Sequence, residues 1–196
     1  MPRRTQVERT QQRKKQVIHE AIRLFGQYGY HGARLADIAR AAGVTEPGLL
    51  HHFPTKEHLL MEVLAERDRL DHERYDPGLH PTAGDPLKPL RELVEHNETV
   101  PGLVQLFTVL VAESIDDQHP GHDFFRRRYQ VLRDQLIDIL LEAQKRGEIR
   151  NDITTEDLVI MLFAMMDGLQ IQWLYEPDKI NMAHCFGQFS ELLRGK

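Results

Sequence analysis

Residues 29–60 read GYHGARLADIARAAGVTEPGLLHHFPTKEHLL, and this stretch decides the fold. Apolar residues recur at helical spacing in its first half, and Gly43 ends that short helix. Thr45 can cap a second short helix, because its hydroxyl can accept a hydrogen bond from a backbone N–H of the first turn. Two short helices joined by a tight turn predict a helix-turn-helix over about residues 34–53.

The rest of the chain reads as helices separated by proline, glycine and polar turns, and no segment alternates apolar and polar residues as a strand would. Further helices are predicted near residues 10–28, 56–75, 87–99, 103–116, 121–146, 155–175 and 179–193. The prediction is an all-α chain of about nine helices. A three-helix head over residues 1–55 precedes a larger helical domain over residues 56–196, whose first helix links the two.

Composition restricts the class of protein. The chain has 196 residues and a single cysteine, Cys185, which excludes a disulfide framework or a multi-cysteine metal site and indicates a reducing compartment. No uninterrupted apolar run reaches the roughly 18 residues of a membrane span, and the N-terminus does not resemble a signal peptide. We therefore expect a cytoplasmic protein with no membrane partner.

Charge is divided unevenly along the chain. Residues 1–56 carry ten lysines and arginines against four acidic residues, whereas residues 57–196 carry fifteen against twenty-six. A basic head on an acidic body predicts that only the head meets a polyanion. A chance cluster on a solvated helix face would give the same imbalance, so charge alone leaves both interpretations open.

The helix-turn-helix itself favours DNA as that polyanion. The second helix of such a motif lies in the major groove, where its N-terminal half reaches the base edges. Small residues such as Ala39, Ala42 and Gly43 let the two helices approach closely, and the tip at residues 45–48 has little bulk. The residues thus predict that the head over residues 1–55 is a DNA-binding domain.

Three segments make the chain resemble the TetR family of bacterial transcription regulators. They are Phe25 with Gly29 and Tyr30, DIARAAGV at residues 37–44, and LLHHFPTKE at residues 49–57. The resemblance covers about the first 60 residues strongly, and the nine-helix layout extends it over the rest of the chain. It implies a sequence-specific regulator that binds a palindromic double-stranded operator as a homodimer.

The resemblance also implies roles for single residues. Those that match DNA-facing positions of the family are Thr45, Pro47, Gly48, His51, His52 and Lys56. Lys56 would contact a phosphate at a helix N-terminus. Glu46 would be repelled by a phosphate but could accept a hydrogen bond from cytosine. Arg34 stands where the family commonly has Thr or Ser and could replace a hydroxyl–phosphate contact with a charged one. The family commonly has Tyr at the position of Leu50, so one phosphate contact is missing here.

A basic N-terminal arm precedes the first apolar residues of the head. Its members are Arg3, Arg4, Arg9, Arg13, Lys14 and Lys15. They could follow the DNA backbone or enter a minor groove. A solvated tail is the alternative, especially for the first two.

Residues 155–175 are apolar on nearly every side, so the helix is expected to be buried on more than one face. One face can meet the domain core and another a partner subunit. In the TetR family this helix and the last one pair with their copies in a four-helix dimer interface. The predicted interface residues are Leu162, Leu169, Trp173, Phe186, Phe189 and Leu193.

The same apolarity permits a pocket for a small apolar or amphipathic effector, since methionine adapts to varied shapes. The predicted apolar lining is Leu103, Phe107, Val111, Phe125, Tyr129, Met165, Met166 and Trp173, and the predicted polar lining is Glu113, Asp167 and Gln170. Ordinary core packing is the alternative for each of them. Asp167 needs a partner, because a carboxylate in so apolar a helix is costly to bury.

Nothing after residue 76 has the spacing of a catalytic site, and His119 and His122 flank a Pro-Gly pair typical of a turn. We predict no enzymatic activity, metal or cofactor. The predicted function is a DNA-binding transcriptional regulator, acting as a repressor that an effector releases from its operator. A constitutive DNA-binding dimer and an activator are the alternatives, together with a small helical enzyme bearing a basic patch.

Overall fold

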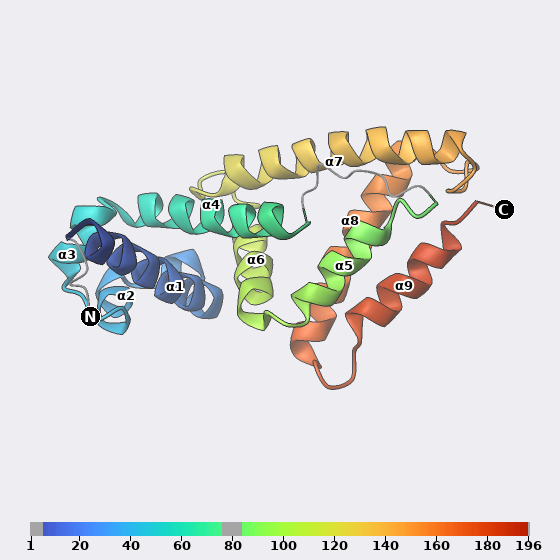
Figure 1. The fold of residues 1–196 in the computed structure, drawn as a ribbon. Helices are drawn as coiled ribbons and strands as arrows, with labels where there is room; N and C mark the ends of the chain where they lie inside the picture. Colours follow the sequence, from blue (N-terminus) through green and yellow to red (C-terminus); the bar gives the residue numbers. More distant parts are fainter. Residues whose placement is uncertain (1–5, 76–83, 196) are drawn as a thin grey trace. The chain divides into compact units, whose positions relative to one another are not determined.

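The computed structural model describes residues 6–75 and 84–195, without the side chains of residues 6, 7, 9 and 70–75. Over these ranges the secondary structure is helical, apart from one isolated bridge between Ile149 and Arg194. The helices are α1 (Gln6–Gly32), α2 (Leu35–Ala41), α3 (Glu46–His52), α4 (Lys56–Tyr75), α5 (Lys88–Asn97), α6 (Pro101–Glu113), α7 (His122–Lys145), α8 (Thr155–Tyr175) and α9 (Met182–Leu192) (Figure 1). The predicted all-α fold of about nine helices is confirmed.

The chain folds into two compact units, each made of two stretches of sequence. The first unit is Met1–Leu70 with Gln105–His122, and the second is Asp71–Val104 with Asp123–Lys196. The boundary predicted after residue 55 lies inside the first unit. Most of α4 and the C-terminal part of α6 therefore belong with the helix-turn-helix.

The first unit is held by apolar side chains that α1 presents at helical spacing. Those of Val17, Ala21 and Phe25 are fully buried. The side chains that are fully buried on the other helices of this unit include Ile38, Leu49, Leu59, Leu60, Leu106 and Leu110. Burial of apolar surface contributes about 25 cal/mol per Å², so this shared core holds the short helices α2 and α3, which would not be stable alone.

A bend interrupts α1 at Gly29, where φ is +69°. A residue with a Cβ rarely adopts this conformation. The helix predicted to end near Tyr28 therefore continues past the bend to Gly32.

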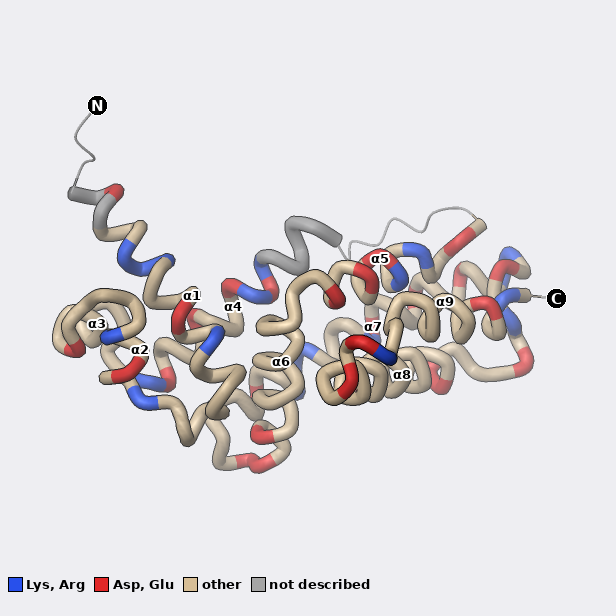
Figure 2. The backbone as a smooth tube through the Cα atoms, turned by 90° about the horizontal axis from the view of Figure 1, so that it is seen from below, with Lys and Arg blue, Asp and Glu red and all other residues tan. Residues whose placement is uncertain are grey.

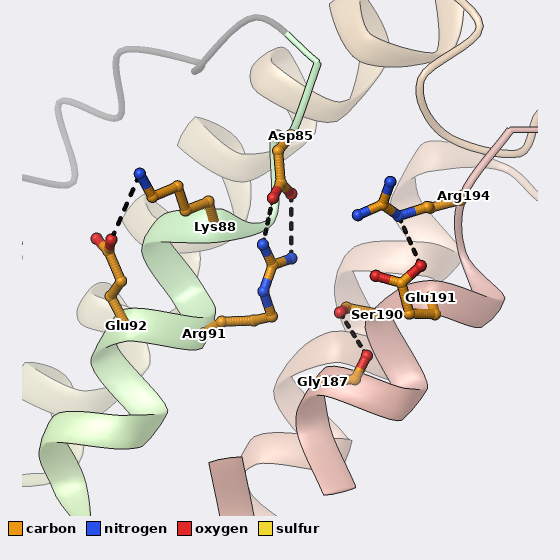
Figure 3. A network of polar contacts seen from close by, with 8 residues as sticks. All are labelled: Asp85, Lys88, Arg91, Glu92, Gly187, Ser190, Glu191 and Arg194. Atoms are coloured by element: carbon orange, nitrogen blue, oxygen red, sulfur yellow. Dashed lines mark hydrogen bonds and ion pairs between the residues drawn. The ribbon is translucent and has the colours of Figure 1, made fainter. Parts of the chain in front are cut away.

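The second unit has its core around α8. In this unit α5 and α9 pack together, as do α8 and α9 (Figure 1). Arg91 donates to both carboxylate oxygens of Asp85 before α5, and Arg194 pairs with Glu191 at 2.8 Å near the end of α9 (Figure 3). Glu98 Oε1 accepts a hydrogen bond of 2.6 Å from the backbone N–H of Met182, which satisfies one of the open donors at the start of α9.

By length and composition, α8 alone among the described helices could cross a membrane, a test that the core helix of a soluble protein also passes. Its buried residues are Thr155, Leu158, Val159, Leu162, Met166, Leu169, Gln170 and Trp173. These side chains lie on one side of the helix, and the apolar ones among them form much of the core of the second unit.

Candidate functional site

Local contacts shape the turn between α2 and α3. Gly43 has a φ of +66°, which permits the tight turn. Thr45 Oγ1 accepts a hydrogen bond of 3.2 Å from the backbone N–H of Gly48, and Pro47 lies in the first turn of α3. The predicted cap is confirmed. Leu49 and Phe53 are fully buried, so α3 is anchored on one side.

The opposite side of α3 and its cap face solvent. Thr45, Glu46, Pro47 and His51 are exposed, and Gly48 and His52 are half-buried. The structure thus gathers six of the predicted DNA contacts on one seven-residue helix and its cap. The rings of His51 and His52 meet edge to face, with centroids 5.3 Å apart.

Arg34 stands at the N-cap of α2, is exposed, and makes no side-chain capping hydrogen bond. It borders a surface recess of about 470 Å³ that Arg23, Tyr28 and Arg40 also line. Arg40 pairs with Asp37 at 3.1 Å. The sequence did not single out Arg23 or Tyr28, because only the fold of α1 onto α2 places them beside Arg34.

Lys56, the predicted phosphate contact at the start of α4, lies against the end of α1. Its Nζ donates a hydrogen bond of 3.2 Å to the carbonyl oxygen of His31 and lies 4.8 Å from the centroid of the Tyr30 ring. Burial lowers the pKa of Lys56, and the negative charge of Glu113 opposes that shift. One of its three N–H donors is used in this way, which leaves the others available for a ligand.

The N-terminal arm is described from its middle onward. The N-terminal half of α1 carries a run of basic residues, blue in Figure 2. Arg13 and Lys15 are exposed, whereas Lys14 pairs with Glu62 at 3.0 Å. Lys14 is therefore tied to α4. Outside the described part lie Arg3, Arg4 and the side chain of Arg9.

Two family models match this sequence. Residues 17–63 match bacterial regulatory proteins of the tetR family, and residues 90–194, more than half of the chain, match the C-terminal domain of BetI-type transcriptional repressors. The chain belongs to the TetR family. As a TetR-family member with an exposed recognition helix, it is a DNA-binding transcriptional regulator.

Relatives that cover most of the chain agree with the TetR-family assignment. The transcriptional repressor KstR2 of Mycolicibacterium smegmatis is 31% identical, with 90% of this chain and 85% of that protein covered. The transcriptional regulator TtgR of Pseudomonas putida is 28% identical, covering 93% and 89%. A transcriptional regulator from Saccharomonospora viridis, solved in complex with choline, superposes with a TM-score of 0.79 at 26% identity and covers 95% and 99%.

The residues predicted for the dimer interface lie inside this TetR-family chain rather than on its surface. Leu162 and Phe186 are fully buried, and Leu169, Trp173 and Leu193 are at most 7% exposed. Phe189 is half-buried against the same core. They are core residues because their side of α8 and α9 faces the rest of the unit. The exposed apolar residues are instead Ile160, Met161, Ile171 and Tyr175 on α8, and Leu192 on α9.

The predicted effector residues are divided between the two units. In the second unit the Tyr129 hydroxyl donates a hydrogen bond of 2.8 Å to Asp167 Oδ2, which supplies a partner for that carboxylate. Phe125, Met166, Gln170 and Trp173 are buried, and Leu103 and Met165 are half-buried. In the first unit Val111 is half-buried and Phe107 is buried, with the Arg67 guanidinium stacked 3.9 Å from its ring centroid. Trp173 also borders a recess of about 450 Å³.

Glu113 is the remaining residue predicted for the effector site, and its carboxylate is hydrogen-bonded to the backbone of α1. Its Oε2 accepts a hydrogen bond of 2.6 Å from the backbone N–H of Tyr30. Glu113 therefore belongs to the contact between α6 and α1 and not to an effector site.

Proposed function

We propose that this regulator is a homodimeric cytoplasmic repressor, which binds a palindromic operator and leaves it when a small apolar or amphipathic effector binds. The observation that carries the proposal is α3, a short helix anchored by Leu49 and capped by Thr45, on which Glu46, Pro47 and His51 are exposed to solvent. Such a helix can enter a major groove without disturbing its own core.

The proposed DNA contacts divide by chemistry. Those on α3 and its cap, Thr45, Glu46, Pro47, Gly48, His51 and His52, would face bases or groove walls. Arg34 and Lys56, at the starts of α2 and α4, would contact phosphates, where helix N-termini favour negative charge. Phosphate contacts position the head, and the α3 contacts select the sequence.

The proposed dimer interface is the exposed stripe of α8. At 100° per residue, Ile160, Ala164, Gly168 and Ile171 fall within an arc of about 80°, with Met161 and Tyr175 inside or just beside it. Small residues in the middle of the stripe allow two helices to approach closely. An apolar stripe with this exposure would be stabilised by a second copy, because association removes it from water.

The proposed effector site lies in the second unit around Tyr129 and Asp167. Phe163 meets the Tyr129 ring edge to face at 5.8 Å, and Met165 and Met166 supply adaptable apolar surface nearby on α8. One polar pair in an apolar setting suits an amphipathic molecule. The complex of the Saccharomonospora viridis relative with choline supports the idea that a small molecule is the signal.

Release requires that the effector bind the DNA-incompetent conformation more tightly. A shift from 1:99 to 99:1 needs a difference of about 5.5 kcal/mol between the two states. An effector with equal affinity for both would stabilise the protein without changing operator affinity.

Selection of random duplexes by the purified protein, followed by sequencing of the retained pool, tests the proposal. We expect a two-fold symmetric consensus of two half-sites. An asymmetric single half-site, or no enrichment at low salt by refolded protein, would contradict it.

A further inference from the structure

The last turn of α6 and the turn that follows it hold the bend of α1. Glu113 ends α6, and its carboxylate accepts the backbone N–H of Tyr30 one residue after the bend. The contact is close, because a Cβ placed on Gly29 would overlap Glu113 Oε1. Glycine at position 29 is therefore required for two reasons: it can adopt the positive φ, and it leaves room for the Glu113 carboxylate.

His119 lies next to the same contact. Its side chain is fully buried, and Nδ1 accepts the backbone N–H of Gly121 at 3.0 Å. Because Nδ1 is an acceptor there, the neutral ring carries its proton on Nε2. That atom lies 3.8 Å from Glu113 Oε2. The ring also meets the rings of Tyr30 and His31 edge to face, with centroids 5.0 and 5.8 Å apart.

The His119 ring is itself fixed by the turn. Ser114 Oγ lies 2.9 Å from Nδ1, and His122 Nδ1 lies 2.9 Å from the carbonyl oxygen of Ser114. A Cβ on Gly121 would come within 2.8 Å of Ser114 Oγ, so glycine is needed there too. The Pro-Gly turn between the two histidines thus serves as a buried support.

The opposite end of this network reaches the proposed DNA surface. Tyr30 presents its ring to the Lys56 ammonium, and the carbonyl of the neighbouring His31 accepts a hydrogen bond from the same ammonium. Polar and aromatic contacts therefore run without a break from α6, through Glu113 and Tyr30, to Lys56 at the start of α4.

We propose that Glu113, supported by His119, is a positioning residue for DNA binding: it holds the bend of α1 so that Lys56 meets a backbone phosphate. This inference rests on the proposed phosphate contact of Lys56.

The test compares Glu113→Ala with Glu113→Gln in operator-binding titrations at several salt concentrations, well below the melting temperature of each variant. The alanine variant should bind at least tenfold more weakly. The glutamine variant should stay within about threefold of wild type, because its amide oxygen still accepts the Tyr30 N–H. Loss of a positioned phosphate contact should also reduce the salt slope by about 0.9.

Asp117→Ala is the matched control, because it removes an equal charge from an exposed residue of the same turn. It should bind the operator as wild type does. Equal weakening of operator binding by Asp117→Ala and Glu113→Ala would overturn the proposal. Unchanged or tighter binding by Glu113→Ala would also overturn it, because loss of a negative charge alone favours binding to DNA. If Glu113→Ala does not fold, Ser114→Ala takes its place: it should weaken operator binding more than threefold, and binding equal to wild type would overturn the proposal.

Lys56→Ala separates this proposal from the DNA contact on which it rests. If Lys56 meets a phosphate, Lys56→Ala reduces the salt slope and adding Glu113→Ala changes it little further. If Lys56→Ala leaves the slope unchanged, the phosphate contact fails. If Lys56→Ala reduces the slope and Glu113→Ala does not, the positioning role fails.

Discussion

The helices α3 and α8 use their exposed faces in opposite ways. The described part of α3 has one buried side chain, Leu49, and presents polar and small residues to solvent. By contrast α8 buries eight residues and still exposes Ile160, Met161, Ile171 and Tyr175. A polar exposed face suits a hydrated groove in DNA, whereas an apolar exposed face suits another protein surface. The exposed face of α3 therefore suits the proposed DNA contact, and that of α8 the proposed dimer interface.

A core residue of α8 and an exposed residue of α7 should respond differently to truncation. Leu162→Ala should lower the free energy of unfolding by about 2–5 kcal/mol, because it leaves a cavity in the core of the second unit. Leu141→Ala, on the exposed side of α7 at 41% exposure, should change it by less than about 0.5 kcal/mol. Urea unfolding at fixed protein concentration measures both. An equal loss of unfolding free energy in the two variants would mean that the Leu162 face of α8 is not buried.

A charged residue on the exposed stripe of α8 should prevent dimerisation and leave each chain folded. Ile171→Glu should give monomers in sedimentation velocity and weaken operator binding about 100-fold, because one head reads only half a palindrome. Val131→Glu on α7 is a matched control, since Val131 is 47% exposed and Ile171 46%. It should remain dimeric, and a dimer of unaltered mass in Ile171→Glu would refute the proposed interface.

Acid should lower the free energy of unfolding through His119, the buried residue next to Glu113. Burial lowers the pKa of His119 below its ordinary 6.5, against the charges of Glu113 and Asp116, which raise it, while His31 lowers it further. The folded state therefore binds fewer protons than the unfolded state, and stability falls as the pH drops below about 6.5, by at most about 1.4 kcal/mol per pH unit from this residue. Denaturant unfolding at several pH values should show a weaker pH dependence in His119→Asn. An identical dependence would assign the effect to other groups.

The smallest effect expected is on a single phosphate contact. Lys56→Ala should weaken binding to all duplexes alike and reduce the salt slope by about 0.9. Titrations on consensus and scrambled duplexes measure both quantities. A change of preferred base at one position would instead place Lys56 among the residues that read sequence.

Elements fixed by local chemistry could be predicted from the sequence. Thr45 caps α3 by accepting the backbone N–H three residues on, and Gly43, predicted to end the preceding helix, has the positive φ of a tight turn. The start of α9 was predicted near residue 179, whereas the helix begins at Met182. The cap there is Asn181, whose side chain accepts the N–H of His184, and its role was not recognised.

Contacts that depend on tertiary structure could not be predicted in this way. Because α8 is apolar all round, its sequence gives no indication of which face is turned inward, and the interface was predicted on core residues such as Leu169. The same limit applies to Glu113, which looked like a polar group in an apolar pocket. Its partner Tyr30 lies 83 residues away in sequence, and only the approach of α6 to the Gly29 bend brings them together.

Two copies of the chain, joined through α8, should place two α3 helices on one duplex. The direct measurement is the mass of the protein–DNA complex, on a duplex bearing the selected consensus and on one bearing half of it. We expect two chains on the full site, bound far more tightly than on the half-site, and a loss of this difference in Ile171→Glu. One chain per duplex, with equal affinity for full and half sites, would contradict the account.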